Sequence, residues 1–439
     1  MRTSSAHRYR IFLLGLLMLI LAFNFVDRTA LGLAVQGIKF DLGLSDTQMG
    51  FIGGIGFALV YSTIGIPIAR YCDRGNRVLV IVVTTVLWSA AVALCGLVAS
   101  FSELLLIRVL VGIGEAGCVP SANSLIADYF SRDERPRAVS IYMQGIPLSL
   151  LLGYIAGGWL NQIYGWRVMF LAIGLPGLVL ALAAWAFLKE PRADGSAARL
   201  PAAARAPLMH VLRALWMIKT FRQLLYFFSV QFIFSYGVLE WTPAYFERSF
   251  GLKSGALGSW LAIIYGLGGI LGTYLVGEWA TRYAPSNEAR QLKGLAVMQC
   301  VCTVLNGFVY VPALTPNAYW ALLWLALSTV TGMMNGPVFA VIQTLVPENM
   351  RATAVAVLYL FANLFGLGLG PWMTGALSDA LRPWAGEESL RYALLIVAPL
   401  SLVGAALLWR AGRVVTSDLL TLRHDRDDMA NPSLLPALE

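Results

Sequence analysis

Four ionisable side chains interrupt two of the longest apolar stretches of the sequence. Asp27 and Arg28 stand in the first stretch, and Arg108 and Glu115 stand in the stretch at 103–130. A charge inside a bilayer is costly, so such residues usually face a cavity or one another and take part in function. Because Arg108 and Glu115 are seven residues apart, they share one helix face, about 10 Å apart along the axis. We therefore expect the two stretches to face each other, with an acid pairing with an arginine.

The chemistry open to this cluster is reversible proton binding by a carboxyl group. Burial favours the neutral acid and a nearby arginine favours the anion, so a change of local geometry can switch the protonation state. Asp27 and Glu115 are thus the candidate proton-coupling residues. Arg28 and Arg108 are their candidate charge partners, or the site of an anionic headgroup. A purely structural ion network is the alternative, although apolar residues would fill that role more simply.

The stretches that carry these residues are long enough to cross a membrane. Hydrophobic residues make up 58% of the 439-residue chain and charged residues 13%, whereas a soluble domain has about 25% charged residues. A membrane-spanning helix needs about 20 mainly apolar residues. A scan with that window predicts an all-α, polytopic membrane protein with twelve transmembrane helices. The expected helices cover residues 11–35, 47–70, 78–99, 103–130, 138–161, 167–188, 223–247, 255–281, 293–313, 318–345, 352–381 and 391–412.

Basic residues in the loops orient the expected helices. Because twelve is even, both ends of the chain lie on one side, and lysine and arginine mark the cytoplasmic side. About three quarters of the 32 such residues fall in the tails and in the loops on the side of the termini. Both termini are therefore predicted to be cytoplasmic, in the inner membrane if the protein is bacterial. The basic N-terminus leads into an apolar run without a cleavage site, which indicates a retained first helix.

The chain divides into two halves that echo each other. The longest polar stretch, 189–222, is expected to be a cytoplasmic linker between six-helix bundles at 1–188 and 223–412, with a cytoplasmic tail at 413–439. Arg-Pro-Arg-Ala-Val-Ser in the first half and Arg-Ala-Thr-Ala-Val-Ala in the second each lead into a glycine-rich stretch. Parallel repeats of this kind are typical of transporters with halves related by pseudo-two-fold symmetry. The small residues let helices pack closely.

The loop between the second and third expected helices reads Ala-Arg-Tyr-Cys-Asp-Arg-Gly-Asn-Arg over 69–77. It resembles the signature loop of the major facilitator superfamily, with alanine in place of the usual glycine. The corresponding stretch of the second half has Thr281 where the acid would stand. A carboxylate such as Asp73 can lie against a helix N-terminus, and Arg74 and Arg77 can form charge-assisted bonds across the interface between the halves. These three residues are candidate cytoplasmic gate residues; an ordinary charged turn is the alternative.

The N-terminal half also resembles the spinster family of that superfamily. The similarity lies in Asn-Phe-Val-Asp-Arg at 24–28, the stretch 108–117, Ile-Ala-Asp-Tyr-Phe at 126–130, Asp-Arg-Gly-Asn-Arg at 73–77 and Gly-Trp-Arg-Val-Met-Phe at 165–170. Spinster proteins export lipids such as sphingosine-1-phosphate and lysophospholipids, and bacterial relatives are studied as proton-linked models. The resemblance implies the major facilitator fold, proton coupling at the two acids, and an anionic headgroup near the two arginines. The C-terminal half shows only general superfamily character.

Polar and aromatic residues inside the expected helices are candidates for the wall of a substrate cavity. The set comprises Asn24, Ser121, Glu240, Trp241, Asn335, Tyr359 and Asn363. Tyr359 and Asn363 are four residues apart and so share a helix face. Hydrogen bonding between helices is the alternative role. No arginine lies in the middle of a second-half helix, so an amphiphile with its anionic head toward the first half and its tail toward the second would suit the chain.

These features predict a secondary active transporter that works by rocker-switch alternating access, is coupled to protons and moves an amphiphilic lipid. The alternative is a proton-coupled transporter of a small organic anion held by the same arginines. An enzyme is disfavoured because His7, His210 and His424 lie outside the expected helices and no nucleotide-binding or metal-binding motif occurs. We expect no cofactor and no metal. A channel is disfavoured because two unlike halves suit rocking about a central site.

The net charge and the cysteine content limit the kinds of binding partner and covalent cross-link that we expect. The net charge of +8 does not indicate nucleic-acid binding, because the basic residues lie in short loops and form no basic face. The five cysteines are too few and too scattered for a disulfide framework and are expected to fill the core. The expected partners are the substrate, protons and membrane lipids, and the protein is expected to act as a monomer.

Overall fold

The first half of the chain forms six helical crossings. The computed structural model describes residues 2–72, 75–131, 133–191, 208–347 and 350–430, and this part of the chain contains helices and turns but no strand. Some crossings are single helices and others are two helices in succession. They are α1 (Arg2–Leu42), α2 (Asp46–Gly53) with α3 (Ile55–Cys72), α4 (Arg77–Cys95), α5 (Phe101–Glu115) with α6 (Cys118–Tyr129), and α7 (Arg135–Met143) with α8 (Gly145–Phe187).

The helix α8 holds two of these crossings. At Gly165 its backbone takes φ 80° and ψ 168°, outside the helical region. Glycine adopts such angles readily because it has no Cβ. The break separates residues 145–164 from 166–187, and each segment has the roughly 20 residues that one crossing needs.

The second half repeats the pattern after a short helix, α9 (Leu208–Met217). Two of its crossings contain a turn of π-helix, a feature often found at functional sites. The crossings are α10 (Lys219–Phe250); α11 (Ser254–Leu261), η2 (Ala262–Leu267) and α12 (Gly268–Tyr283); α13 (Glu288–Phe308); α14 (Ala318–Gly332) with α15 (Asn335–Leu345); α16 (Arg351–Phe361), η5 (Ala362–Leu367) and α17 (Gly368–Ala385); and α18 (Ser389–Val397) with α19 (Leu400–Ala430). The short 3₁₀ turns η3 (Pro312–Leu314) and η6 (Gly386–Glu388) precede α14 and α18.

The twelve-helix prediction is confirmed. Within the described residues, nine helical stretches are long and apolar enough to cross a membrane. Two of them, 137–187 and 353–422, are long enough for two crossings each, and α13 adds a more polar one. The total is twelve, six in each half.

The last helix is longer than its apolar stretch predicts. The predicted helix ends at residue 412, whereas α19 continues to Ala430. The continuation is anchored to the second half, because Val415 is buried and the Asp418 carboxylate accepts hydrogen bonds from the Thr220 amide and hydroxyl, both at 2.7 Å. Part of the expected cytoplasmic tail is therefore helix. Most of the expected linker lies outside the described residues, and its last part forms α9.

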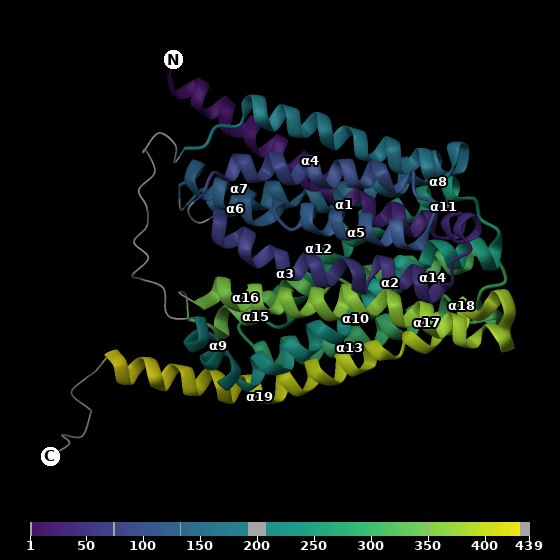
Figure 1. Cartoon of the computed structure of the whole chain (residues 1–439). Helices are drawn as coiled ribbons and strands as arrows, with labels where there is room; N and C mark the ends of the chain where they lie inside the picture. Colours follow the sequence, from purple (N-terminus) through teal and green to yellow (C-terminus); the bar gives the residue numbers. More distant parts are fainter. Residues whose placement is uncertain (1, 73–74, 132, 192–207, 348–349, 431–439) are drawn as a thin grey trace.

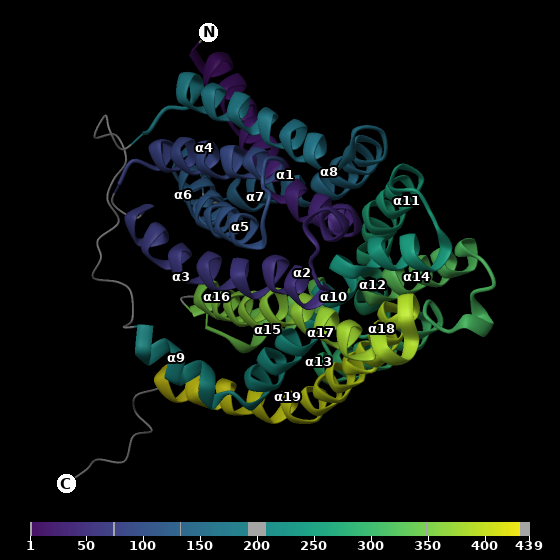
Figure 2. The ribbon, with the colours of Figure 1, turned by 45° about the vertical axis from the view of Figure 1, so that its right-hand side comes forward.

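The two halves lie side by side with both termini at one end of the molecule (Figures 1 and 2). We call this end proximal and the opposite end distal. Of the first half, α2 packs against α17 and α8 packs against α11 of the second half. The five cysteines are free, and all except Cys300 are buried.

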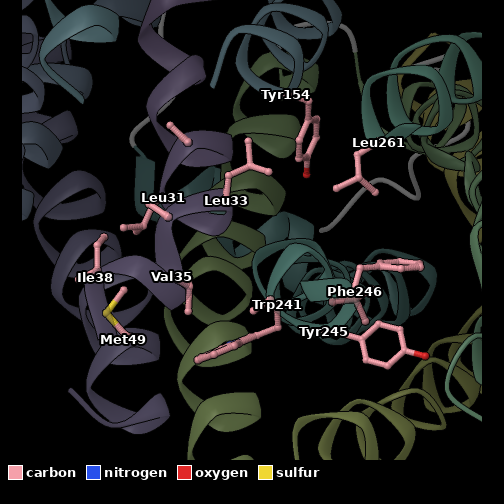
Figure 3. Packing of buried hydrophobic residues seen from close by; sticks show 14 of the residues in the cluster. Leu31, Leu33, Val35, Ile38, Met49, Tyr154, Trp241, Tyr245, Phe246 and Leu261 are labelled. Atoms are coloured by element: carbon pink, nitrogen blue, oxygen red, sulfur yellow. The ribbon is translucent and has the colours of Figure 1, made fainter. Parts of the chain in front are cut away.

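One hydrophobic cluster crosses the boundary between the halves. Figure 3 shows part of it, with residues of α1 and α2 on one side and Trp241, Tyr245 and Phe246 of α10 on the other. Two further clusters lie within single halves, one around α10, α13 and α19 and the other around α1, α6 and the end of α8. The core therefore holds each half together and also joins them.

Candidate functional site

Two ion pairs connect α1 and α5 inside the first half. Nη2 of Arg28 lies 2.7 Å from Oε2 of Glu115, and Nε of Arg28 lies 3.2 Å from the same oxygen. Nη1 of Arg108 lies 2.5 Å from Oδ2 of Asp27. Each acid is therefore bound by an arginine of the other helix, although each also has an arginine near it in sequence. The arrangement neutralises all four charges in pairs, which lowers the cost of burying them.

Arg28 is the accessible member of this cluster. Its side chain is 15% exposed, whereas the other three side chains are at most 2% exposed. Aromatic rings surround its guanidinium carbon, with centroids at 4.2 Å for Phe25, 5.0 Å for Phe57 and 5.2 Å for Tyr61. Such rings stabilise a cation through their negative faces. The guanidinium is thus held in place by an acid and by aromatic rings, and Arg28 keeps more exposed surface than the other three side chains.

Several polar atoms of the cluster are buried without a hydrogen-bond partner among the described residues. They are both amide atoms of Asn24, Oδ1 of Asp27, Nε of Arg108 and Oε1 of Glu115. Buried polar atoms are nearly always paired in native structures, so these atoms are unusual. Each carboxyl group uses one oxygen for its arginine and keeps the other for a proton or a polar ligand. Asn24 lies one helical turn from Arg28 and can serve the same ligand.

An aromatic stripe of the second half faces Arg28. One member, Tyr236, interacts with the positive charge of Arg28. The Tyr236 hydroxyl also donates a hydrogen bond to Oδ1 of Asn363 at 3.4 Å. The stripe consists of Phe228, Phe232, Tyr236, Phe339 and Tyr359, which belong to α10, α15 and α16 and form successive ring contacts with centroids 5.1–6.5 Å apart. Three of these residues follow the i, i+4, i+8 spacing of one helix face in α10. The same spacing is visible in the sequence, where it indicates an aromatic face on this helix.

The other expected cavity residues have mixed positions. Trp241 is fully buried and donates from Nε1 to the Pro371 carbonyl at 2.8 Å, so it joins α10 to α17. Ser121 is buried and bonds to the Gly117 carbonyl at 2.7 Å within its own turn. Asn335 is exposed at the start of α15. Glu240 is partly buried where α10 meets the first half.

Of the three expected gate residues, only Arg77 lies within the described part of the chain; Asp73 and Arg74 lie outside it. Arg77 is fully buried at the start of α4. It binds Asp128 of α6 at 2.6 Å, and it also binds Glu190, which follows α8. Both acids belong to the first half, so in this conformation Arg77 ties the proximal ends of three first-half helices together.

A second charge cluster, not found from the sequence, joins the halves at the distal end. The buried Asp46 carboxylate at the start of α2 binds Lys39 and accepts hydrogen bonds from Arg248 of α10 at 2.6 and 2.8 Å. Ser378 of α17 donates to it at 2.7 Å. In return, the Asp379 carboxylate accepts hydrogen bonds from the backbone amides of Asp46 and Thr47, at 3.1 and 2.7 Å. An acid of the second half thus caps a helix of the first.

Glycines allow the halves to touch along the same end. A Cβ on Gly54, between α2 and α3, would lie 2.5 Å from the Gly368 carbonyl of α17, and a Cβ on Gly158 of α8 would lie 2.5 Å from the Ser254 carbonyl of α11. Only glycine permits such approach. No comparable packing joins α3 to α16 or α7 to α12 within the described residues. The halves are therefore closed against each other at the distal end.

The comparisons with known proteins agree with this architecture. The sequence profile of the Major Facilitator Superfamily matches residues 17–371. The chain belongs to the major facilitator superfamily. It is an integral, multi-pass membrane transporter and not an enzyme, as the sequence predicted.

Relatives of this major facilitator transporter include an efflux pump and a hexuronate transporter. It is 34% identical over 411 residues to an MFS-type efflux pump of Mycolicibacterium smegmatis, covering 92% of this chain and 93% of the relative. It is 28% identical to the hexuronate transporter of Bacillus subtilis, covering 87% of this chain and 90% of the relative. A solved structure of a bacterial homologue of the human lysosomal transporter spinster, inward-facing and unoccupied, has a TM-score of 0.80, 29% identity and coverage of 93% and 98%. The spinster-like character expected from the first half is confirmed.

Proposed function

We propose that this transporter moves an amphiphilic anion, of the lysophospholipid or sphingosine-1-phosphate type, by rocker-switch alternating access coupled to protons. The observation that carries the proposal is the position of Arg28. Its guanidinium is partly exposed in the first half and faces the aromatic stripe of the second half. An anionic headgroup can bind the guanidinium by charge-assisted hydrogen bonds. An acyl chain can then lie along the aromatic rings.

Coupling to protons is assigned to Asp27 and Glu115. In this conformation each carboxyl group is bound by an arginine through one oxygen, and its other oxygen has no hydrogen-bond partner among the described residues. When an anionic headgroup takes Arg28, Glu115 loses its counter-charge. A neutral acid costs far less in a dry interior than an unpaired carboxylate. Binding of the substrate anion would therefore favour protonation of Glu115, and release would reverse it. Arg108 holds Asp27 in the same way, about two helical turns from Glu115 along α5.

The sidedness follows from the distribution of basic loops, which assigns the proximal end to the cytoplasm. The distal closure then makes this conformation inward-facing. In the opposite conformation the Asp46 cluster would separate and the proximal ends would meet. Asp73 and Arg74 are proposed to act there as cytoplasmic gate residues, with Arg77 fixing the helices that carry them. The transporter is proposed to work as a monomer, since each chain contains both halves.

A small organic anion is the second candidate substrate. The hexuronate transporter of Bacillus subtilis is 28% identical and covers 87% of this chain. A carboxylate of such a substrate would use the same Arg28. The aromatic stripe distinguishes the two proposals. A polar sugar acid would gain little from three phenylalanine and two tyrosine rings, whereas an acyl chain would gain about 25 cal/mol per Å² of buried apolar surface.

The deciding experiment is uptake into proteoliposomes. Labelled lysophosphatidylglycerol and labelled glucuronate are offered separately, with and without an inward-directed pH gradient. The lipid proposal predicts saturable transport of the lysolipid, stimulated by the gradient and abolished in Arg28→Ala. Transport of glucuronate alone would favour the second candidate. Transport at the same rate with and without the pH gradient would rule out the proposed coupling to protons. Arg282→Ala, which alters an exposed ion pair with Glu278, serves as the matched control.

A further inference from the structure

Among the described residues, three carboxyl groups and two guanidinium groups gather where α1, α5 and α10 meet. Asp27 and Glu115 are bound by Arg108 and Arg28, and the two pairs cancel in charge. Glu240, in the membrane-spanning α10, is a third carboxyl group close to them. Within the part of the chain that the structure describes, Glu240 makes no ion pair. If it were ionised, this region would carry one uncompensated negative charge.

The position of Glu240 is defined by two glycines of the first half. A Cβ on Gly53 of α2 would lie 2.9 Å from Oε1 of Glu240, and a Cβ on Gly32 of α1 would lie 3.0 Å from its backbone carbonyl oxygen. The two glycines therefore form a recess in which the Glu240 side chain and backbone rest. Since α10 belongs to the second half, this contact crosses the boundary between the halves.

The charged groups around Glu240 come from three helices. Asp27 and Arg28 of α1 and Arg108 of α5 act on its carboxyl group, and Tyr154 of α8 is a further titratable neighbour. Both arginines already bind another carboxylate at 2.5–2.7 Å. They can offer Glu240 only a more distant attraction, which the neighbouring Asp27 carboxylate opposes. An unpaired carboxylate is costly where little water reaches it, whereas the neutral acid costs much less.

We propose that Glu240 holds a proton in this conformation and is the third member of the proton-coupling group. The recess made by Gly32 and Gly53 exists only while the halves meet at the distal end. When they rock apart, Glu240 moves with the second half while Asp27, Arg28, Arg108 and Glu115 stay with the first. The Glu240 carboxyl group then leaves both the glycine recess and the charged residues of the first half. A proton taken up in one conformation can thus be released in the other, without either ion pair of the first half having to open.

The protonation state of Glu240 can be measured without a substrate, on the full-length protein in liposomes. Infrared difference spectra compare the wild type with each variant. A protonated carboxyl group has a carbonyl stretching band that a carboxylate lacks. The wild type at neutral pH is expected to show such a band. The band should disappear in Glu240→Gln and shift in Glu240→Asp, while it remains in Asp27→Asn, Glu115→Gln and the exposed control Glu278→Gln. A wild-type spectrum without the band, or a band that survives in Glu240→Gln, would overturn the proposal.

The role in coupling rests on the proposed function and has its own measurement. Uptake of labelled lysophosphatidylglycerol or glucuronate, whichever the wild type transports, is compared with and without a pH gradient. Glu240→Gln should lose the stimulation by the gradient, and Glu240→Asp should recover part of it. If the wild type is uncoupled, the proposed function fails, whereas the infrared result still decides where the proton lies. If the wild type is coupled and Glu240→Gln remains so, only the inference about Glu240 fails. Should Glu240→Gln not fold, Gly53→Ala tests the same recess, because its methyl group would displace Oε1 and shift the infrared band.

Discussion

Nη1 of Arg108 lies 2.5 Å from Oδ2 of Asp27, and this ion pair fixes α5 against α1 in the interior of the first half. Both side chains are at most 2% exposed. Removing one partner of a buried pair strands the other charge and costs about 3–5 kcal/mol. The pair therefore has a structural role in addition to any role in transport, and the two can be separated by experiment.

Arg108→Ala is predicted to destabilise the protein by about 3–5 kcal/mol, since it leaves the Asp27 carboxylate without its counter-charge. Thermal unfolding in detergent measures the change. The control Arg282→Ala removes an exposed pair in which the arginine side chain is 69% exposed, and such pairs contribute about 0–1 kcal/mol. Adding Asp27→Asn to Arg108→Ala should restore part of the stability, because the stranded charge is gone. An unchanged double variant would contradict this explanation.

Asp27→Asn and Glu115→Gln are each predicted to lose the dependence of uptake on a pH gradient while exchange of substrate across the membrane persists. Both substitutions mimic the neutral acid permanently, so the carboxyl group can no longer alternate between its two states. Uptake and counterflow in proteoliposomes at matched and mismatched pH provide the measurement. Retained stimulation by the gradient in both variants would assign the four charges to substrate binding or structure.

The sequence predicted the charged residues of the site but not their partners. Asp27, Arg28, Arg108 and Glu115 were recognisable because charges are rare in apolar stretches. Their crosswise pairing depends on how α1 and α5 rotate about their axes, which residue spacing within one helix does not determine. The Asp46 cluster was not found for a related reason. The Asp379 carboxylate accepts a hydrogen bond from the Asp46 amide, although the two residues are 333 positions apart in the sequence. In the local sequence, each is an ordinary charged residue near the end of an expected helix.

The Asp46 cluster is predicted to hold the distal end closed. Asp46→Asn leaves Lys39 and Arg248 close together without the negative charge between them, and hydrogen bonds to charged groups contribute about 1.5–3 kcal/mol each. The population should therefore shift about tenfold or more toward a distal-open state. Spin labels at Phe40→Cys and Lys253→Cys, in a background with Cys300→Ser, report the distance across this end. The control Asp41→Asn alters an acid whose contacts, Trp166 and Arg167, both lie in its own half. Equal distance distributions for Asp46→Asn and wild type would refute the latch.

The proximal end is predicted to face the cytoplasm. Met209 of α9 is 75% exposed and lies at the proximal end, while Lys253 is exposed in the distal loop between α10 and α11. With Cys300 replaced by serine, a membrane-impermeant thiol reagent should label Lys253→Cys in intact cells. It should label Met209→Cys only after the cytoplasmic face is opened. The reverse pattern would invert the topology and, with it, the assignment of this conformation as inward-facing.

The aromatic stripe is predicted to select for a long apolar chain on the substrate. Phe232 contacts both Tyr236 and Tyr359, so Phe232→Ala interrupts the stripe between its end at Arg28 and its exposed end. Loss of one such contact surface should cost about 1–2 kcal/mol of binding free energy, equivalent to roughly 5- to 30-fold in affinity. Competition by lysophosphatidylglycerols of increasing chain length measures the effect. In the wild type, affinity should rise with each added methylene, and in Phe232→Ala the rise should stop where the chain reaches the gap. Phe187→Ala, in a 58%-exposed ring at the end of α8 away from the stripe, is the matched control. If chain length has no influence in the wild type, Arg28 binds a small anion, and the stripe has no part in selecting the substrate.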